Sequence, residues 1–253
     1  MHILPVRTAL LTKTSDLADA ILSGERIQKG DIVVVSSKAL ATVTGESITV
    51  PSVSDVSDEA KAIATRTGQT PAFVEAILHE LTRLNGNIVG ECPGAVLTEV
   101  HPQGMTGSIL VANAGLDQSN AAEGTVVGWP HDPVKELASL RKKLEAAVGA
   151  PIAMILSDSC CLPRRRGVIA IALCACGIDP LLPQKGRKDL FGRALRLTDE
   201  AICDQLATAA NSVMGNAAQS TPAAVIRDHG IPFSEFAGWV PGISKDEDLF
   251  RSL

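Results

Sequence analysis

Apolar and polar positions along this chain follow two patterns, and each pattern predicts a different kind of element. Short uninterrupted apolar runs are typical of buried strands. Apolar residues at helical spacing, preceded by a capping residue or by proline, predict helices. We expect strands at residues 31–35, 88–89, 95–100, 108–112, 152–156, 168–175 and 223–227. We expect helices at residues 14–24, after Ser57, after Thr70, at 134–148 and at 198–214.

The predicted helices and strands do not alternate regularly, so the sequence favours an α+β fold with a mixed sheet over a doubly wound α/β fold. The 253 residues suffice for one large domain, and no repeat or low-complexity linker interrupts them. We therefore expect a single domain over residues 1–253, with two interleaved subdomains as the alternative. The sequence has no GxGxxG or GxxxxGK[ST] element, so any nucleotide must be held in another way.

Two carboxylates follow apolar runs about forty residues apart in the chain. Asp117, in the segment 113–120, follows the run 108–112, and Asp158 follows the run 152–156. A carboxylate at the end of a strand lies at a sheet edge, where it can meet a ligand. Two such carboxylates with serine and asparagine oxygens nearby suit Mg²⁺ or Mn²⁺, and such an ion commonly accompanies phosphate. The alternative is structural, because these residue types also form turns and helix caps.

The number and position of charged residues indicate which partners the chain can bind. A formal net charge of -5 argues against broad nucleic-acid binding. The dense basic cluster, Arg164–Arg166, follows Asp158 by a few residues. This position favours a phosphate or carboxylate ligand, whereas a solvated surface cluster is the alternative.

The cysteines and the N-terminus indicate the compartment. The six cysteines contain no CxxC pair, which argues against a structural zinc site. The N-terminus lacks the apolar stretch of a signal peptide, and the longest apolar run, Val168–Cys176, is too short to span a bilayer. We expect a cytoplasmic protein without membrane or nucleic-acid partners, whose cysteines are reduced and act mostly as small buried hydrophobes.

Several short motifs together resemble one known family over nearly the full length of the chain. The motifs are Ala112–Asn120 (AGxDxSN), Pro130–Pro133 (PxDP), Ser157–Ser159 ([TS]D[TS]), Gly177–Leu181 (GxxPL), Gly186–Arg193 (GxxDxxGR), Asp204–Ala207 with Val213–Gly215, and Asp246–Arg251. They resemble those of the coenzyme F-420-0:L-glutamate ligases, the gamma-glutamyl ligase (CofE) family. The AGxDxSN and GxxDxxGR motifs are specific when they occur together.

The resemblance implies an α+β ligase fold of its own kind, with a homodimer of intertwined subunits. It implies an enzyme that joins L-glutamate to a deazaflavin phospholactate through an amide bond, driven by GTP, with Mg²⁺ or Mn²⁺ and, as a further candidate, K⁺. At matching positions, the implied metal ligands are Asp117, Asp158 and Ser159. The implied nucleotide contacts are Ser37, Asn120 and the backbone from Met214 through Gly215 and Asn216 to Thr221.

Elementary chemistry agrees with this reaction. A carboxylate is a poor acyl donor to an amine, whereas an acyl phosphate has a good leaving group. A divalent metal stabilises the charge that develops during phosphoryl transfer. Arg165 is a candidate to orient the acid, and Lys38 is a candidate phosphate ligand; for both, a solvent-exposed surface charge is the alternative.

The chain departs from the family pattern in four places, and the first is Thr8–Leu11, which replaces a GLPL-type loop. The segment Cys160–Gly167 replaces the common FGRPWRxG, with Leu162 for the first arginine and Arg164 for the tryptophan. Thr42 stands where the family carries a nucleotide-contacting lysine, and Ala170 stands where it carries an aspartate. Three readings therefore remain open: the family reaction, the same chemistry on another acid or amine, and an inactive nucleotide-binding homologue. GTP versus ATP, and the number of glutamates added, also stay open.

Overall fold

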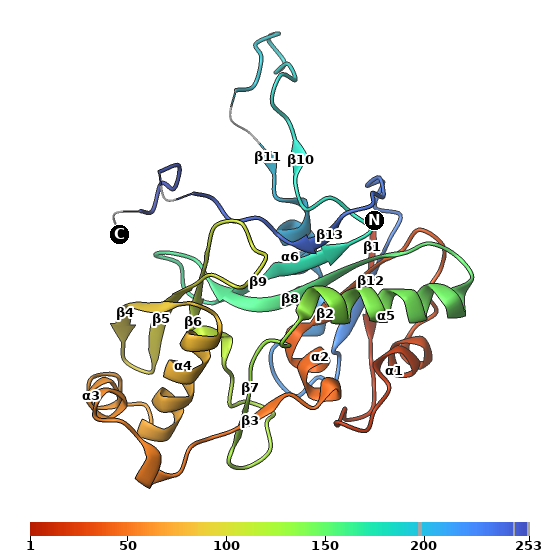
Figure 1. The fold of residues 1–253 in the computed structure, drawn as a ribbon. Helices are drawn as coiled ribbons and strands as arrows, with labels where there is room; N and C mark the ends of the chain where they lie inside the picture. Colours follow the sequence, from red (N-terminus) through yellow and green to blue (C-terminus); the bar gives the residue numbers. More distant parts are fainter. Residues whose placement is uncertain (197–198, 245, 252–253) are drawn as a thin grey trace.

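The computed structural model describes residues 1–196, 199–244 and 246–251, and its centre is a six-stranded mixed sheet (Figure 1). The strands lie in the order β1 (His2–Val6), β12 (Ala223–Arg227), β2 (Ile32–Ser36), β8 (Ala153–Cys161), β9 (Val168–Cys176) and β13 (Ala237–Trp239). The central pair β2–β8 is parallel, and the other neighbours are antiparallel.

Helices cover both faces of this sheet, which explains why its central strands are continuous apolar runs. In β2, Val33 and Val35 belong to the hydrophobic cluster shared with α1 (Leu17–Gly24), α2 (Ser37–Thr44) and α5 (Pro133–Val148). Ile32 and Val34 point to the opposite face and pack with α6 (Ile202–Met214). No helix in the described part of the chain is long and apolar enough to cross a membrane.

A second group of elements shares the first of these two clusters. It consists of β4 (Asn87–Cys92), β5 (Ala95–Val100) and β6 (Ile109–Ala112), with α3 (Asp58–Thr67), α4 (Pro71–Arg83) and the short turns η1 (Val53–Asp55) and η2 (Asn113–Gly115). A two-stranded ribbon of β3 (Ser47–Thr49) and β7 (Thr125–Val127) lies between this group and the large sheet (Figure 1).

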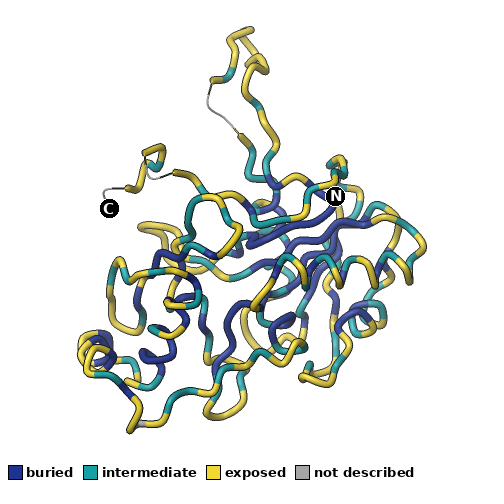
Figure 2. Tube along the Cα trace, in the orientation of Figure 1, coloured by how far each residue is buried: buried dark blue, intermediate teal, exposed yellow. Residues whose placement is uncertain are grey.

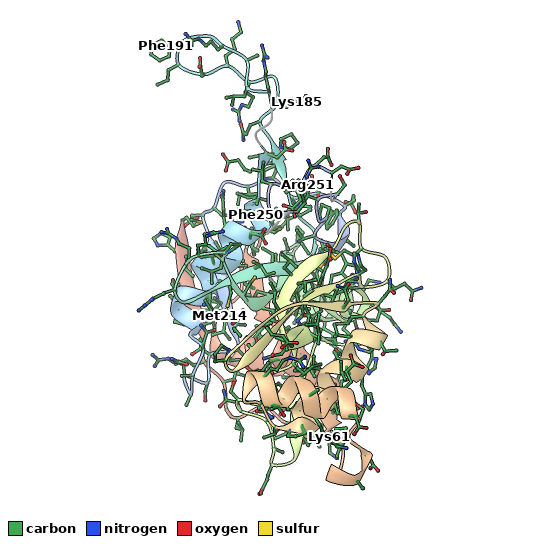
Figure 3. The ribbon with its side chains drawn as sticks, turned by 90° about the vertical axis from the view of Figure 1, so that its left-hand side faces the viewer. Lys61, Lys185, Phe191, Met214, Phe250 and Arg251 are labelled. Carbon is green, nitrogen blue, oxygen red and sulfur yellow. The ribbon has the colours of Figure 1, made fainter. Side chains whose placement is uncertain are left out.

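A long hairpin leaves this body and extends away from it (Figures 1 and 2). It begins and ends with the short strands β10 (Leu182–Pro183) and β11 (Asp199–Glu200). Near its tip Leu190 is 100% exposed and Phe191 is 85% exposed, and Figure 3 shows Phe191 at the far end. We call the described residues 182–196 and 199–200 the protruding hairpin.

Helix α6 also covers part of a strand edge. Strand β13 pairs with β9 only as far as Cys174. Beyond that point Asp204 accepts a hydrogen bond from the Ala172 N–H at 2.8 Å, and the Thr208 hydroxyl donates to the Ala170 carbonyl at 2.7 Å. The two helix side chains satisfy backbone groups that an edge strand would otherwise expose. They thereby hold the part of β9 that pairs with the outer half of β8.

The α+β prediction with a mixed sheet is confirmed, as are most predicted helices and strands. The cap at Asp16 accepts hydrogen bonds from two backbone N–H groups of α1, and Ser57 caps α3 in the same way. Pro71 and Pro133 occupy the first positions of α4 and α5, where the absent N–H costs nothing. The elements that were not predicted are helix α2 and strands β1, β3, β7, β10, β11 and β13.

The predicted boundaries differ most from the observed ones at two elements. The strand expected at 152–156 continues to Cys161 as β8, because Ser157–Ser159 pair with β9 after a bulge at Leu156. Asp158 therefore projects from a strand rather than from a loop. The helix expected at 198–214 begins only at Ile202, because residues 199–200 form β11, and Thr198 lies outside the described residues.

Candidate active site

A cavity of about 520 Å³ opens at the ends of β2 and β8, between the large sheet and the β6–β7 region. Five separate stretches of chain contribute to its wall, within residues 8–11, 36–42, 111–120, 157–170 and 211–222. Of the ten site residues predicted from the sequence, eight line this cavity: Lys38, Asp117, Asn120, Asp158, Ser159, Met214, Gly215 and Asn216. A wall built from such distant segments is typical of a ligand-binding site.

Asp117 reaches the cavity because the chain turns sharply just before it. Asn113, Ala114 and Gly115 all have left-handed backbone conformations, with φ of 54°, 53° and 76°. Lys38 donates to the Asp117 carboxylate at 2.5 Å, and Ser119 donates to it from its backbone N–H and its hydroxyl. Burial alone would raise the pKa of Asp117, but these hydrogen bonds outweigh it and hold the pKa below its usual value. Asp117 is therefore ionised at neutral pH.

Asp158 lies deeper, and its environment differs. Its carboxylate accepts a hydrogen bond from the Trp129 indole Nε1–H at 2.5 Å. Burial raises the pKa of Asp158, although hydrogen bonds from Trp129, Ser159 and Ser37 and the charge of Lys38 partly oppose the rise. The Lys38 ammonium thus acts on both carboxylates, but it donates its hydrogen bonds to Asp117 and to the carbonyl and hydroxyl of Ser119.

The third predicted ligand connects the sheet to the end of α6. The Ser159 hydroxyl lies 3.1 Å from the Asn216 side-chain oxygen. Helix α6 ends at Met214, and Gly215 then takes a φ of 72°, which turns the chain back over the cavity. Ser159 and Asn216 therefore stand side by side, although 57 positions separate them in sequence.

Two predicted residues lie outside the cavity wall. Ser37 is buried, with 2% of its surface exposed, and its hydroxyl interacts with Asp158 from behind. Arg165 is exposed at the turn between β8 and β9 and does not line the cavity. Cys161 and Val168, which precede and follow the basic turn, do line it. Of residues 160–167, Cys161 alone lines the cavity, so the arginine cluster lies beyond the cavity wall.

The donor atoms in the cavity fit a hard divalent cation. Among the described residues that line it, the ionisable ones of opposite sign are Lys38, Asp117 and Asp158, so the formal charge of the wall is -1. The nearby donors are oxygens from the two carboxylates, Ser159 and Asn216, which suit Mg²⁺ or Mn²⁺ better than zinc. Among the described residues, no three histidine, cysteine or acidic side chains gather in a metal-binding group. A cation here would therefore need hydroxyl, amide or phosphate oxygens as well.

Sequence reasoning did not single out Trp129. Its signal was weak: it is one of two tryptophans in a chain with 3% aromatic residues, and it precedes a helix start. Its contact with Asp158 joins residues 29 positions apart, and no local pattern specifies it.

Comparison with known proteins agrees with the motifs. The family described as F420-0:Gamma-glutamyl ligase matches residues 5–228. A coenzyme F420:L-glutamate ligase of Methanopyrus kandleri is 35% identical over 223 residues, which cover 88% of this chain and 84% of that protein. The protein of the same name from Methanocaldococcus jannaschii is 35% identical over 226 residues, covering 89% and 86% of the two chains. The one from Archaeoglobus fulgidus is 32% identical over 243 residues, covering 96% and 90%.

These similarities define the class of the protein: it is an enzyme, and a ligase. More particularly, the chain belongs to the F420-0:Gamma-glutamyl ligase family, as the sequence motifs predicted.

Proposed function

We propose that this enzyme forms an amide bond between a carboxylate, activated as an acyl phosphate, and the amino group of L-glutamate, with coenzyme F420-0 as the acid. GTP and Mg²⁺ or Mn²⁺ are the proposed cofactors, and K⁺ is a further candidate. One observation carries the proposal: the cavity gathers Asp117, Asp158 and Ser159 around Lys38, whose ammonium acts on both carboxylates, and its formal charge is -1.

Each group of residues in the cavity has its own proposed role. Asp117, Asp158 and Ser159 would hold the cation, and Asn216 stands beside Ser159. When bound, the cation would supply charge stabilisation to phosphate oxygens. Lys38 lies at the cavity wall with its ammonium beside Asp117, from where it can contact a phosphate. Asn120 and the backbone from Met214 to Asn216 line the same space and would contact the nucleotide.

The acid substrate would enter past the turn between β8 and β9. Arg164–Arg166 are exposed there, and Cys161 and Val168 connect the turn to the cavity. Three adjacent cations repel one another unless an anion compensates them, so a phosphorylated or polycarboxylic acid suits this position. The second candidate function is the same chemistry on a different acid, and the altered sequence of this turn favours it. Replacing residues 160–167 by FGRPWRNG would then shift activity toward the deazaflavin substrate.

The protruding hairpin supports a homodimer. Leu190 and Phe191 expose large apolar surfaces at the end of a segment that extends away from the body of the subunit (Figure 3). Such surfaces are typical of protein–protein contacts. We expect Phe191→Ser to shift the molecular mass measured by light scattering from dimer to monomer, whereas Leu10→Ser, at another exposed apolar residue, leaves it unchanged. A wild-type monomer at micromolar concentration would contradict the dimer.

Calorimetry with Mn²⁺ and GTP tests the site. Asp117→Asn and Asp158→Asn should each weaken metal-dependent GTP binding strongly, because each removes a charged oxygen ligand. Asp58→Asn, at an exposed carboxylate on α3, is the matched control and should bind as the wild type does. An unchanged affinity in either cavity variant removes that residue from the site. Parallel titrations with ATP show which nucleotide binds more tightly. An assay with coenzyme F420-0 and glutamate shows whether the enzyme joins these two substrates.

A further inference from the structure

Several contacts with neighbouring residues hold Trp129 in place. Its side chain is buried, and the ring lies 6.2 Å from that of Trp239 at an interplanar angle of 54°. Its carbonyl accepts a hydrogen bond from Arg83, which also forms two hydrogen bonds with the buried Glu80. The remaining polar group, the indole Nε1–H, donates to Asp158. The indole therefore has little freedom to turn away from that carboxylate.

The space around the indole is equally restricted. A Cβ atom on Gly115 would lie 2.7 Å from the Trp129 Nε1 atom. A Cβ atom on Gly128 would lie 2.9 Å from a Leu116 methyl group and 3.1 Å from a Glu80 carboxylate oxygen. Glycine at both positions thus allows the segment to pack closely against the turn that precedes Asp117.

The same segment also holds Asp117. The Asp117 N–H donates to the Val127 carbonyl at 2.9 Å, and the Val127 N–H donates to the Asp117 carbonyl at 3.0 Å. Val127 thus fixes the main chain of Asp117, and Trp129, two residues later, holds the side chain of Asp158. The segment Val127–Trp129 joins the two cavity carboxylates through short, directional contacts.

We propose that Trp129 is a positioning residue that orients the Asp158 carboxylate and, with Val127, sets its placement relative to Asp117. An indole N–H donates but carries no charge, so it orients a carboxylate without cancelling its negative charge. The charge of Asp158 then remains available to a cation in the cavity. This role rests on the proposed metal- and nucleotide-dependent function.

The binding test compares two conservative variants. Trp129→Phe keeps an aromatic ring but removes the N–H donor. Trp239→Phe makes the same change in the neighbouring ring, which, among the described residues, donates no hydrogen bond to Asp117 or Asp158. We expect the Kd for Mn²⁺ with GTP to rise about tenfold or more in Trp129→Phe, the usual effect of losing a group that orients a metal ligand. We expect Trp239→Phe to stay within about twofold of the wild type, since it removes no such group. Thermal unfolding followed by circular dichroism confirms that both variants are folded.

A second measurement does not depend on binding. The chain has two tryptophans, so its ¹H–¹⁵N spectrum contains two indole N–H signals, and the one that remains in Trp239→Phe belongs to Trp129. Asp158→Ala should shift this signal upfield, because the hydrogen bond to the carboxylate is lost. An unmoved signal would overturn the proposal, and so would wild-type affinity for Mn²⁺ and GTP in Trp129→Phe. Absence of Mn²⁺–GTP binding in the wild type would instead refute the proposed function, and the positioning role with it.

Discussion

Gly115→Ala probes the closest approach in the site. Gly115 has a φ of 76°, and an added Cβ would lie within 2.7–3.2 Å of three atoms of the Trp129 indole. Real Cβ atoms do not approach neighbours so closely, so the indole or the turn must move. Either movement disturbs the hydrogen bond between Trp129 and Asp158.

The expected loss of stability has two parts. A left-handed conformation costs alanine about 1–2 kcal/mol. Forcing an extra carbon into a packed site costs roughly a further 1–3 kcal/mol. The sum is about 2–5 kcal/mol, and for a protein of this size each kcal/mol lowers Tm by roughly 2–4 °C. We therefore expect Gly115→Ala to lower Tm by about 4–20 °C.

Gly124→Ala is the matched control for this substitution. Gly124 has nearly the same φ, 73°, but an added Cβ there would meet no atom within 4 Å. It should therefore lose only the conformational part, about 1–2 kcal/mol. Thermal unfolding by circular dichroism measures both variants. Equal Tm values would refute the reasoning, because they would mean that the indole does not press on Gly115.

Three further predictions concern the turn and the covered edge of β9. Arg165→Ala should raise the KM for the acid far more than that for GTP, as lost substrate binding would; equal changes would remove Arg165 from the acid site. Thr208→Val leaves the Ala170 carbonyl without its hydroxyl donor and should cost about 1–3 kcal/mol in urea unfolding. Ser212→Ala removes an exposed hydroxyl from the same helix and should cost less than about 0.5 kcal/mol, so an equal loss would contradict the edge role. Burial raises the pKa of Asp204, so its ionisation opposes folding once the pH rises above the unfolded value of 3.8. Asp204→Asn should therefore stabilise the protein at pH 7 but not at pH 3. An equal loss of stability at both pH values would argue against this.

Local signals in the sequence account for most of the fold. Helix starts at Asp16, Ser57, Pro71 and Pro133 could be predicted because a cap or a proline acts within a single turn. The apolar run at 223–227 likewise predicted β12 with its observed bounds.

Elements without such signals were missed. Strand β1 begins with a histidine and contains Pro5, which a strand tolerates at the sheet edge where β1 lies. Helix α2 directly follows a strand, so its apolar residues read as a continuation, and only Gly45 in a left-handed conformation marks its end.

The residues of the candidate site also fall into those that the sequence predicted and those that it could not. Motifs placed eight of the ten predicted residues on one cavity, because short patterns record which residue types must meet a ligand. They could not show that Ser37 lies behind Asp158 or that Trp129 holds it. Both contacts depend on how distant segments pack, and packing leaves no periodic trace in the sequence.

The position of β2 has a consequence for how the chain acquires its structure during synthesis. This strand, apolar over residues 32–35, lies between β8 and β12, so its first neighbour is made more than 100 residues later and its second almost 190 residues later. At about 5–20 residues per second, the ribosome needs roughly 10–40 s to supply both. Throughout that time residues 32–35, which end with no exposed surface, must avoid pairing with other chains. The enzyme therefore depends during translation on a slow, long-range closure of its central sheet, and the cavity can form only after that closure is complete.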